Sequence, residues 1–338
     1  MLLLIRITIA LIILCPLQLK AQEEEKKLTA QYRFLQEVPC QISNLQFSSN
    51  GLGLAYACDG DIYYLTLKEP TPIRVTATKF RESNPVWSPD GSKIAYQKDS
   101  TESSSIWVYS TISKVHTRVN KIKENCFNPS WAPNGRTIAF STDTYGSVDV
   151  MIKDFDYNKE RRLTAARGDE FIFGFHPSGK FVGYYERGTE EEDIYAVSLT
   201  GKEALPLTRS EALELNPTWS YDGSKVLFLV QDEAEKVIYT SDFPYGESST
   251  IDRTSSSLLP IISAKGEWVI YEKLEPEKDL YLYNIKRRNR SALGLNEFDR
   301  INEMAWSIGG RIIAFSTIES NQVSKIWLGN ISAFLKAR

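Results

Sequence analysis

Histidine and serine patterns give little support for catalysis by this sequence. The chain has 338 residues but only two histidines, His116 and His176, which lie far apart. Neither has a second histidine at metal-ligand spacing, and no G-x-S-x-G nucleophile motif is present. We therefore expect two surface imidazoles, no metal site, no cofactor and no enzymatic activity.

Two sets of polar residues are candidates for binding a partner instead. The first set is Asn84, Asn128 and Asn216, each three residues before a tryptophan, and Asn44 holds the same place in a divergent copy. The second set is acidic and comprises Glu170, Glu190, Glu191, Glu192 and Glu214. What these side chains can do depends on the elements that position them.

The asparagines belong to an internal repeat. The stretch N-P-V-W-S-P-D-G-S-K-I-A-Y at 84–96 returns at 128–140 and 216–228, and degraded copies begin near residues 44, 172, 259 and 303. One glycine anchors each copy, at intervals of 40 to 44 residues: Gly51, Gly91, Gly135, Gly179, Gly223, Gly266 and Gly310. A fixed period in this range indicates a repeat architecture.

Each repeat is expected to form four short antiparallel strands. Pro89-Asp90-Gly91 has hairpin chemistry, since proline presets φ, aspartate bonds its own backbone and glycine accepts a positive φ. The third and fourth expected strands have recurring residues such as Ile106-Trp107 and Arg162-Leu163-Thr164, and the repeat shows no helical periodicity. Sheets repeated around an axis predict an all-β fold, a seven-bladed β-propeller of four-stranded blades.

The P-x-W-S-P-D-G-x-x-I-A-F core, the I-Y mark and the L-T ending resemble the WD40-like (PD40) repeats of TolB-type β-propellers. The resemblance covers nearly the whole chain after residue 21. It implies a non-catalytic scaffold of the bacterial cell envelope that binds a protein or peptide, such as an envelope lipoprotein or a membrane-complex component. Some seven-bladed propellers of similar repeat type are polysaccharide lyases with a histidine-rich metal centre. An oligogalacturonate-like lyase and a glycan-binding module are therefore the alternatives.

The repeat also assigns places to the recurring side chains. Trp87, Trp131, Trp219 and Trp306 stand in register, and we expect them to pack blade against blade. The asparagines are expected where the innermost strand enters its blade near the channel mouth. There they either contact a partner or cap a local turn.

Loop charges predict an acidic face and a basic face. In a four-stranded meander, the second-to-third loops share one face with the blade-to-blade loops. The expected acidic residues there are Glu186, Glu190, Glu191, Glu192, Asp193, Asp232, Glu233, Glu235, Glu275, Glu277 and Asp279, with Glu82, Asp169, Glu170, Glu211, Glu214, Glu297 and Asp299 between blades. The third-to-fourth loops carry Lys114, Arg118, Lys159, Arg161, Arg162, Lys286, Arg287, Arg288 and Arg290. We expect a protein partner at the acidic face, with ordinary solvated loops as the alternative; the net charge of −3 gives no reason to expect nucleic acid.

The two ends of the chain carry further expectations. Residues 1–21 have the basic, apolar and small-residue order of a secretory signal peptide. Cleavage after Ala21 leaves residues 22–338 as one periplasmic or secreted propeller domain, monomeric and without a stable membrane span; a retained anchor or lipidation is the alternative. Gln31–Gln36 is a spare fourth strand, and we expect it to complete the last blade and close the ring.

Three cysteines remain after residue 21: Cys40, Cys58 and Cys126. An odd number excludes a complete disulfide framework. Cys40 and Cys58 fall at the outer ends of the first expected hairpin. Either they form a disulfide there or all three are buried thiols.

Overall fold

A computed structural model describes residues 30–121, 124–188, 193–201, 204–209, 212–244, 246 and 248–336. The proposed signal peptide at residues 1–21 lies outside these ranges. No helix in the described ranges is long and apolar enough to cross a membrane.

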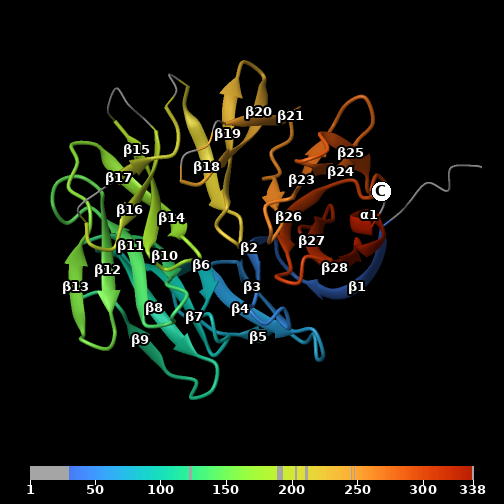
Figure 1. The fold of residues 1–338 in the computed structure, drawn as a ribbon. Helices are drawn as coiled ribbons and strands as arrows, with labels where there is room; N and C mark the ends of the chain where they lie inside the picture. The colour runs from blue at the N-terminus through green and yellow to red at the C-terminus, as the bar shows by residue number, and fades with distance from the viewer. Residues whose placement is uncertain are drawn as a thin grey trace, which may run out of the picture.

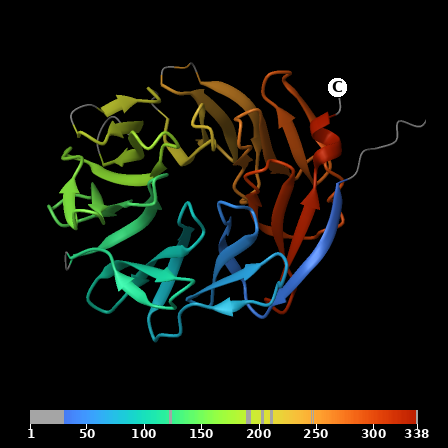
Figure 2. The ribbon, with the colours of Figure 1, turned by 60° about the horizontal axis from the view of Figure 1, so that its bottom comes forward.

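The described chain forms seven four-stranded antiparallel sheets, and Figure 2 shows them arranged as a ring around an open centre. The predicted seven-bladed all-β propeller is therefore confirmed. Blade 1 holds β2 (Ile42–Phe47), β3 (Gly53–Cys58), β4 (Asp61–Thr66) and β5 (Ile73–Arg74). Blade 2 holds β6 (Arg81–Trp87), β7 (Lys93–Asp99), β8 (Ser104–Ser110) and β9 (His116–Arg118). Blade 3 holds β10 (Cys126–Trp131), β11 (Thr137–Thr142), β12 (Asp149–Asp154) and β13 (Lys159–Arg162).

Blade 4 holds β14 (Asp169–Phe175), β15 (Phe181–Arg187), β16 (Ile194–Ser198) and β17 (Ala204–Pro206). Blade 5 holds β18 (Glu214–Trp219), β19 (Lys225–Asp232), β20 (Glu235–Asp242) and β21 (Ser249–Thr254). Blade 6 holds β22 (Ile261–Ile262), β23 (Trp268–Lys273), β24 (Asp279–Asn284) and β25 (Asn289–Ala292). Blade 7 holds β26 (Ile301–Trp306), β27 (Ile312–Ile318), β28 (Ser324–Asn330) and β1 (Gln31–Val38), and the helix α1 (Ser332–Lys336) follows β28 (Figure 1).

The S-P-D-G turn between first and second strands is built from local hydrogen bonds. In blade 2 the Ser88 hydroxyl accepts the backbone N–H of Lys93 at 2.9 Å, and the Asp90 carboxylate accepts the N–H of Ser92 at 3.0 Å. The hydroxyl of Ser88 also donates to Asp90, and this bond, together with those from Ser92, lowers the pKa of Asp90 to about 2. Gly91 has φ of 69°, a conformation that glycine adopts without a steric penalty.

The residues that recur on the second, third and fourth strands also have structural roles. An aromatic ring of the second strand stacks on its cross-strand partner in the third, as Tyr184 does on Tyr195 with centroids 5.3 Å apart. The threonine of the L-T ending lies 14 residues after the aliphatic residue that begins the third-strand motif, and its hydroxyl accepts a hydrogen bond from the backbone N–H of that residue. The Thr164 hydroxyl, for example, accepts the N–H of Val150 at 2.9 Å and so holds the blade's outer edge.

The recurring tryptophans join neighbouring blades, as expected. Trp131 donates its indole N–H to the carbonyl of Val86 at 3.2 Å, and Trp219 donates to Gly174 at 3.2 Å. Each acceptor lies on a first strand of the preceding blade. The rings therefore belong to the packing between blades.

The ring is closed by the N-terminal strand, which was also predicted. β1 pairs antiparallel with β28 from Gln31 opposite Asn330 to Val38 opposite Ser324; Figure 2 shows β1, in blue, against the red last blade. Cys40 and Cys58 form a disulfide that ties the segment after β1 to blade 1, whereas Cys126 is a buried free thiol. Of the two alternatives for the cysteines, the disulfide is the correct one.

Candidate partner-binding site

The four asparagines lie on the first strands of blades 1, 2, 3 and 5 and face the centre of the ring. They share the left-handed conformation, with φ of 51° to 55°, which asparagine tolerates better than most residues. Each sits in a β-bulge inside its strand, so they do not mark the point of strand entry as we expected. All four, Asn44, Asn84, Asn128 and Asn216, are among the residues that line a cavity in the central channel.

Together the asparagines border a channel cavity of about 270 Å³. Asn84 donates its amide N–H to the side-chain oxygen of Asn128 at 3.2 Å and to that of Gln97 at 3.4 Å. The bond to Asn128 links blades 2 and 3 at the channel wall, and the bond to Gln97 lies within blade 2. The amide of Asn216, by contrast, is exposed, and it also lines a second and larger cavity.

That larger cavity, of about 1010 Å³, opens where blade 6 departs from the repeat. Its first strand β22 has two residues, whereas the first strands of the other blades have six or seven. The wall therefore includes the segment from β21 to β22, the hairpin between β23 and β24, and the loop leading into β26. All three belong to the face that carries second-to-third and blade-to-blade loops, which we call the crossing-loop face.

The rim of this cavity exposes aliphatic side chains. Leu259 is 47% exposed and Leu274 is 38% exposed, and both border the opening. Met304 and Pro260 extend the apolar surface inward. A concave site with apolar walls and a few polar groups is the common form of a binding site in proteins.

Charged groups in the cavity are held at defined places. The buried Glu272 carboxylate accepts the hydroxyl of Ser256. Burial raises the pKa of Glu303, although the backbone N–H groups of Asn44 and Leu45 donate to its carboxylate. The ammonium of Lys278 donates to the backbone carbonyls of Phe298, at 3.3 Å, and Asp299.

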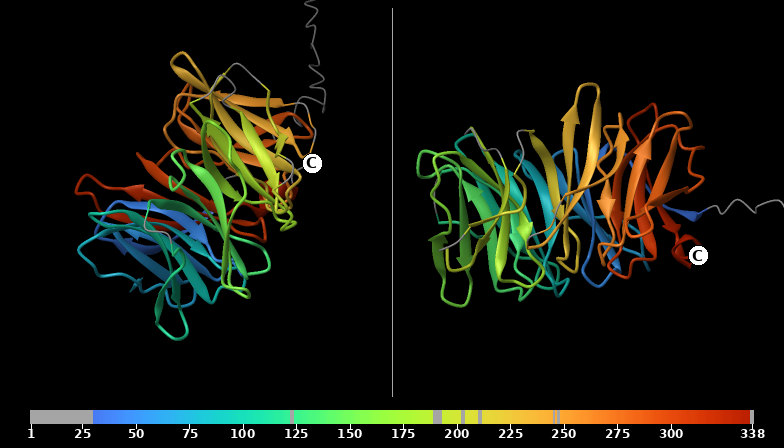
Figure 3. Two further views of the ribbon diagram at one scale, coloured as in Figure 1. Left: turned by 90° about the vertical axis from the view of Figure 1, so that its left-hand side faces the viewer. Right: turned by 45° about the horizontal axis from the view of Figure 1, so that its top comes forward.

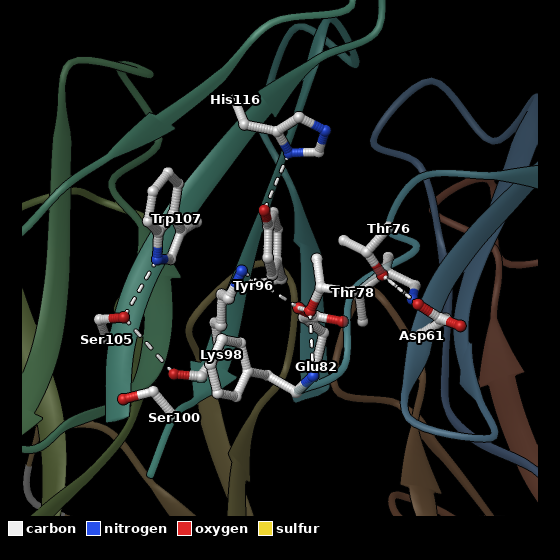
Figure 4. Close-up of polar contacts among 12 residues, drawn as sticks. Asp61, Thr76, Thr78, Glu82, Tyr96, Lys98, Ser100, Ser105, Trp107 and His116 are labelled. Carbon is white, nitrogen blue, oxygen red and sulfur yellow. Dashed lines mark hydrogen bonds and ion pairs between the residues drawn. The ribbon is translucent and has the colours of Figure 1, made fainter. Parts of the chain in front are cut away.

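The expected loop positions of Glu82, Glu170 and Glu214 are wrong. Each is 1% exposed and lies near the start of a first strand, β6, β14 or β18. Figure 4 shows Glu82 beside Thr78 and Lys98; the Thr78 hydroxyl donates to it at 2.6 Å and the Lys98 ammonium lies 3.6 Å away. These carboxylates fasten the blade-to-blade connection, so they cannot form a charged outer surface.

Glu170 shows the energetic consequence of this burial. Desolvation raises its pKa to about 7, against the opposing hydrogen bonds from the Thr164 hydroxyl and the Ala166 backbone N–H. Within the described part of the chain, one oxygen of the carboxylate has no hydrogen-bond partner. Ionisation of such a group is disfavoured because it must lose water without full replacement.

Other predicted acidic positions divide between surface and interior. Glu190, Glu191 and Glu192 lie outside the described residues. Asp193 and Asp279 are buried at the start of third strands, where Asp279 accepts the N–H groups of Leu280, Gly294 and Leu295. The side chains of Glu233, Glu235, Glu275, Glu277, Glu297 and Asp299 remain exposed on the crossing-loop face.

The histidines are also not both at the surface. His116 is exposed on β9, and its ring nitrogen lies 2.8 Å from the Tyr96 hydroxyl (Figure 4). His176 is buried in the turn after β14, where its Nε2 atom lies 3.0 Å from the Gly223 carbonyl oxygen. Neither histidine is among the described residues that line the two channel cavities.

Figure 3 shows the ring of blades from two further sides. The ring and its two cavities, which share Gln46, Asn216 and Pro217, define a class: a propeller with a lined central channel and a larger cavity at blade 6. The chain belongs to the TolB beta propeller (PD40) family, whose pattern matches residues 44–170 and 72–310. The predicted family is therefore confirmed. A comparison with curated proteins gives no match.

Solved structures support the same fold. TolB from Acinetobacter baumannii has 20% identity and a TM-score of 0.55, over 74% of this chain and 62% of that one. This chain thus spans less than two thirds of that TolB. An oligogalacturonate lyase in complex with manganese has 12% identity and a TM-score of 0.69, over 92% of this chain and 99% of that one. An oligogalacturonate lyase from Vibrio parahaemolyticus gives 13% identity, a TM-score of 0.68, and 91% and 99% coverage.

Proposed function

We propose that this protein is a non-catalytic scaffold that binds a protein partner at the channel mouth on the crossing-loop face. The observation that supports it is the cavity of about 1010 Å³ with exposed Leu259 and Leu274 at its rim. Exposed aliphatic groups around a concave site commonly mark protein contacts. The family and the signal-like N-terminus favour a partner in the bacterial envelope, such as a lipoprotein or a membrane-complex component, met in the periplasm or after secretion.

Site-specific photocrosslinking tests this proposal. A photoreactive amino acid at Leu274 should capture a discrete envelope protein in native cells. The same group at Leu52, which is 65% exposed in the β2–β3 turn on the opposite face, is the matched control. Equal capture at both positions, or capture at neither, would contradict binding at this face.

A second candidate function is polysaccharide lyase activity. The longer structural match to two oligogalacturonate lyases favours it, since nearly all of each lyase is covered. Incubation of the purified protein with oligogalacturonate and manganese should produce an ultraviolet-absorbing unsaturated product if this candidate is correct. The scaffold proposal expects no such product, and chelation should leave its partner binding unchanged.

A further inference from the structure

Blade 6 leaves part of its second strand without a first-strand partner on the channel side. β22 pairs with β23 only through Ile261 opposite Ile270 and Ile262 opposite Val269. In blade 5, by contrast, the first strand pairs with the second as far as Glu214 opposite Val230. The space that a longer first strand would occupy is part of the large cavity, and we call it the blade 6 notch. Its walls are Leu259, Leu274, Glu272, Asp299, Arg300 and Glu303.

Local hydrogen bonds hold the notch open without a strand. The Thr254 hydroxyl donates to the Glu272 carbonyl at 2.6 Å, and the Ser256 hydroxyl donates to the Glu272 carboxylate. The Thr254 hydroxyl thereby satisfies a backbone carbonyl that a neighbouring strand would otherwise pair, and the Ser256 hydroxyl satisfies the buried side chain of the same residue. The segment after them then runs past Leu258, which is buried, to Leu259, which is not.

The charge of the notch is negative. Its lining has three carboxylates, on Glu272, Asp299 and Glu303, against the two cations of Lys278 and Arg300. The Lys278 ammonium is already bonded to two backbone carbonyls. Exposed Glu275 and Glu277 stand in the adjoining β23–β24 hairpin and add to the negative rim. A cationic group is therefore the complementary one.

The apolar part of the notch is aliphatic. None of the described residues that line the cavity is aromatic, whereas Leu259, Leu274, Pro260 and Met304 all contribute. The described lining therefore offers no aromatic face on which a sugar ring could stack, and its aliphatic groups suit peptide side chains better. An extended peptide commonly binds beside a strand edge that lacks a partner, and side-chain pockets next to that edge select its residues.

We propose that the blade 6 notch binds an extended peptide segment in which a lysine or arginine lies between aliphatic residues. The aliphatic side chains pack on Leu259 and Leu274, and the cation lies near Glu303 and Asp299. This inference rests on the proposed function, because it specifies the part of the partner that enters the cavity. The length of β23 that has no first-strand partner sets the scale of the segment at a few residues.

Selection from a phage library of random peptides, each about 12 residues long, tests the inference. Enriched sequences should contain Lys or Arg between aliphatic residues, and one of them is then synthesised and titrated by fluorescence anisotropy. Leu274→Ser and Glu303→Gln should each weaken its binding by about tenfold, as for residues at the centre of an interface. Leu52→Ser, on the opposite face, should leave the affinity unchanged.

Three outcomes would overturn the inference. They are selection of acidic peptides, failure to enrich any sequence, and equal effects of Leu52→Ser and Leu274→Ser. The Gln side chain keeps an acceptor for the backbone N–H groups of Asn44 and Leu45, and melting curves check that each variant folds. A native partner that crosslinks at Leu274 but binds Glu303→Gln as tightly as wild type would overturn this inference and leave the proposed function standing.

Discussion

At the residue scale, Glu170 should make stability depend on pH. Its pKa is about 7 in the fold and lower in the unfolded chain, so the unfolded state loses its proton first as pH rises. The free energy of unfolding should therefore fall between about pH 4.5 and pH 7. Glu170→Gln removes this loss, and at pH 8 it should be more stable than wild type by up to about 3 kcal/mol.

Urea denaturation at pH 5 and pH 8 measures this effect. Wild type and Glu170→Gln should differ little at the lower pH and most at the higher one. Glu277→Gln, at an exposed site, is the control and should follow the wild type at both. Parallel stability curves for wild type and Glu170→Gln would show that burial of the carboxylate carries no such cost.

The repeat glycines give a second prediction at this scale, because two of them differ only in their surroundings. Gly223 and Gly310 have φ of 73° and 69°. A Cβ at Gly310 meets no atom within 4 Å, whereas one at Gly223 would lie 2.3 Å from a ring nitrogen of His176. Gly310→Ala should cost about 1 kcal/mol for the left-handed conformation, and Gly223→Ala about 1–3 kcal/mol more for overpacking. Equal losses in thermal or urea unfolding would contradict this packing of the turns.

At the element scale, β1 is the strand whose removal should matter most. It covers the edge of β28, and its Leu35 and Val38 are buried in a core shared by blades 7 and 1. A chain that begins at Pro39 should melt well below a chain that begins at Ala30, and it should form oligomers through the exposed edge. Calorimetry and size-exclusion chromatography measure both effects. Identical melting of the two chains would mean that closure contributes no stability.

The disulfide supplies a further test of closure. Cys40 and Cys58 are separated by 18 residues, and a loop of this size predicts a contribution of about 3 kcal/mol. Replacement of both cysteines by alanine should lower the free energy of unfolding by about that amount. Reducing agent should destabilise the wild type but have no effect on the double variant. If reducing agent left the free energy of unfolding of the wild type unchanged in urea denaturation, the disulfide between Cys40 and Cys58 would be contradicted.

The elements show how far sequence alone could go. Turn glycines, cross-strand aromatics and L-T endings act through local bonds, so their repetition predicted every blade and the closing strand. Glu82, Glu170 and Glu214 were predicted to lie in loops because the prediction used their charge and ignored their position in the repeat. These residues fall on the same 44-residue period as Val38, Cys126 and Leu258, which are all buried.

The large cavity could not be predicted because it depends on a strand that fails to form. In the degraded copy of blade 6, Leu259 stands where blades 1, 2, 3 and 5 have an asparagine in the left-handed conformation, whereas Ile172 and Glu303 hold this place in blades 4 and 7. Blades 4 and 7 form first strands of seven and six residues without this asparagine, whereas β22 has two residues, so loss of the asparagine alone does not predict the short strand. The residue at position 259 is visible in the sequence, but the cavity depends on the length of β22 and on side chains from three neighbouring blades.

At the scale of the whole molecule, the two faces differ in charge less than a count of loop residues suggests. Buried carboxylates reduce the acidic face, and the Arg290 guanidinium on the opposite side is paired with Asp252. What remains on the crossing-loop face is an exposed set that includes Glu275 and Glu277, next to the cavity. A partner would therefore meet charge near the opening and apolar contacts within it.

This arrangement separates the rate of association from affinity. Exposed charges mainly steer encounter, and their reach is about 8 Å at physiological ionic strength. The double variant Glu275→Gln/Glu277→Gln should slow association of the crosslinked partner and flatten its salt dependence, while its dissociation rate stays close to wild type. Arg287→Gln/Arg288→Gln, at exposed positions of the β24–β25 hairpin on the other face, is the matched control. Surface plasmon resonance at several salt concentrations measures both rates.

An association rate that responds only to the arginine variant would place the partner on the opposite face. A rate that responds to neither variant would mean that the loop charges only solvate the protein.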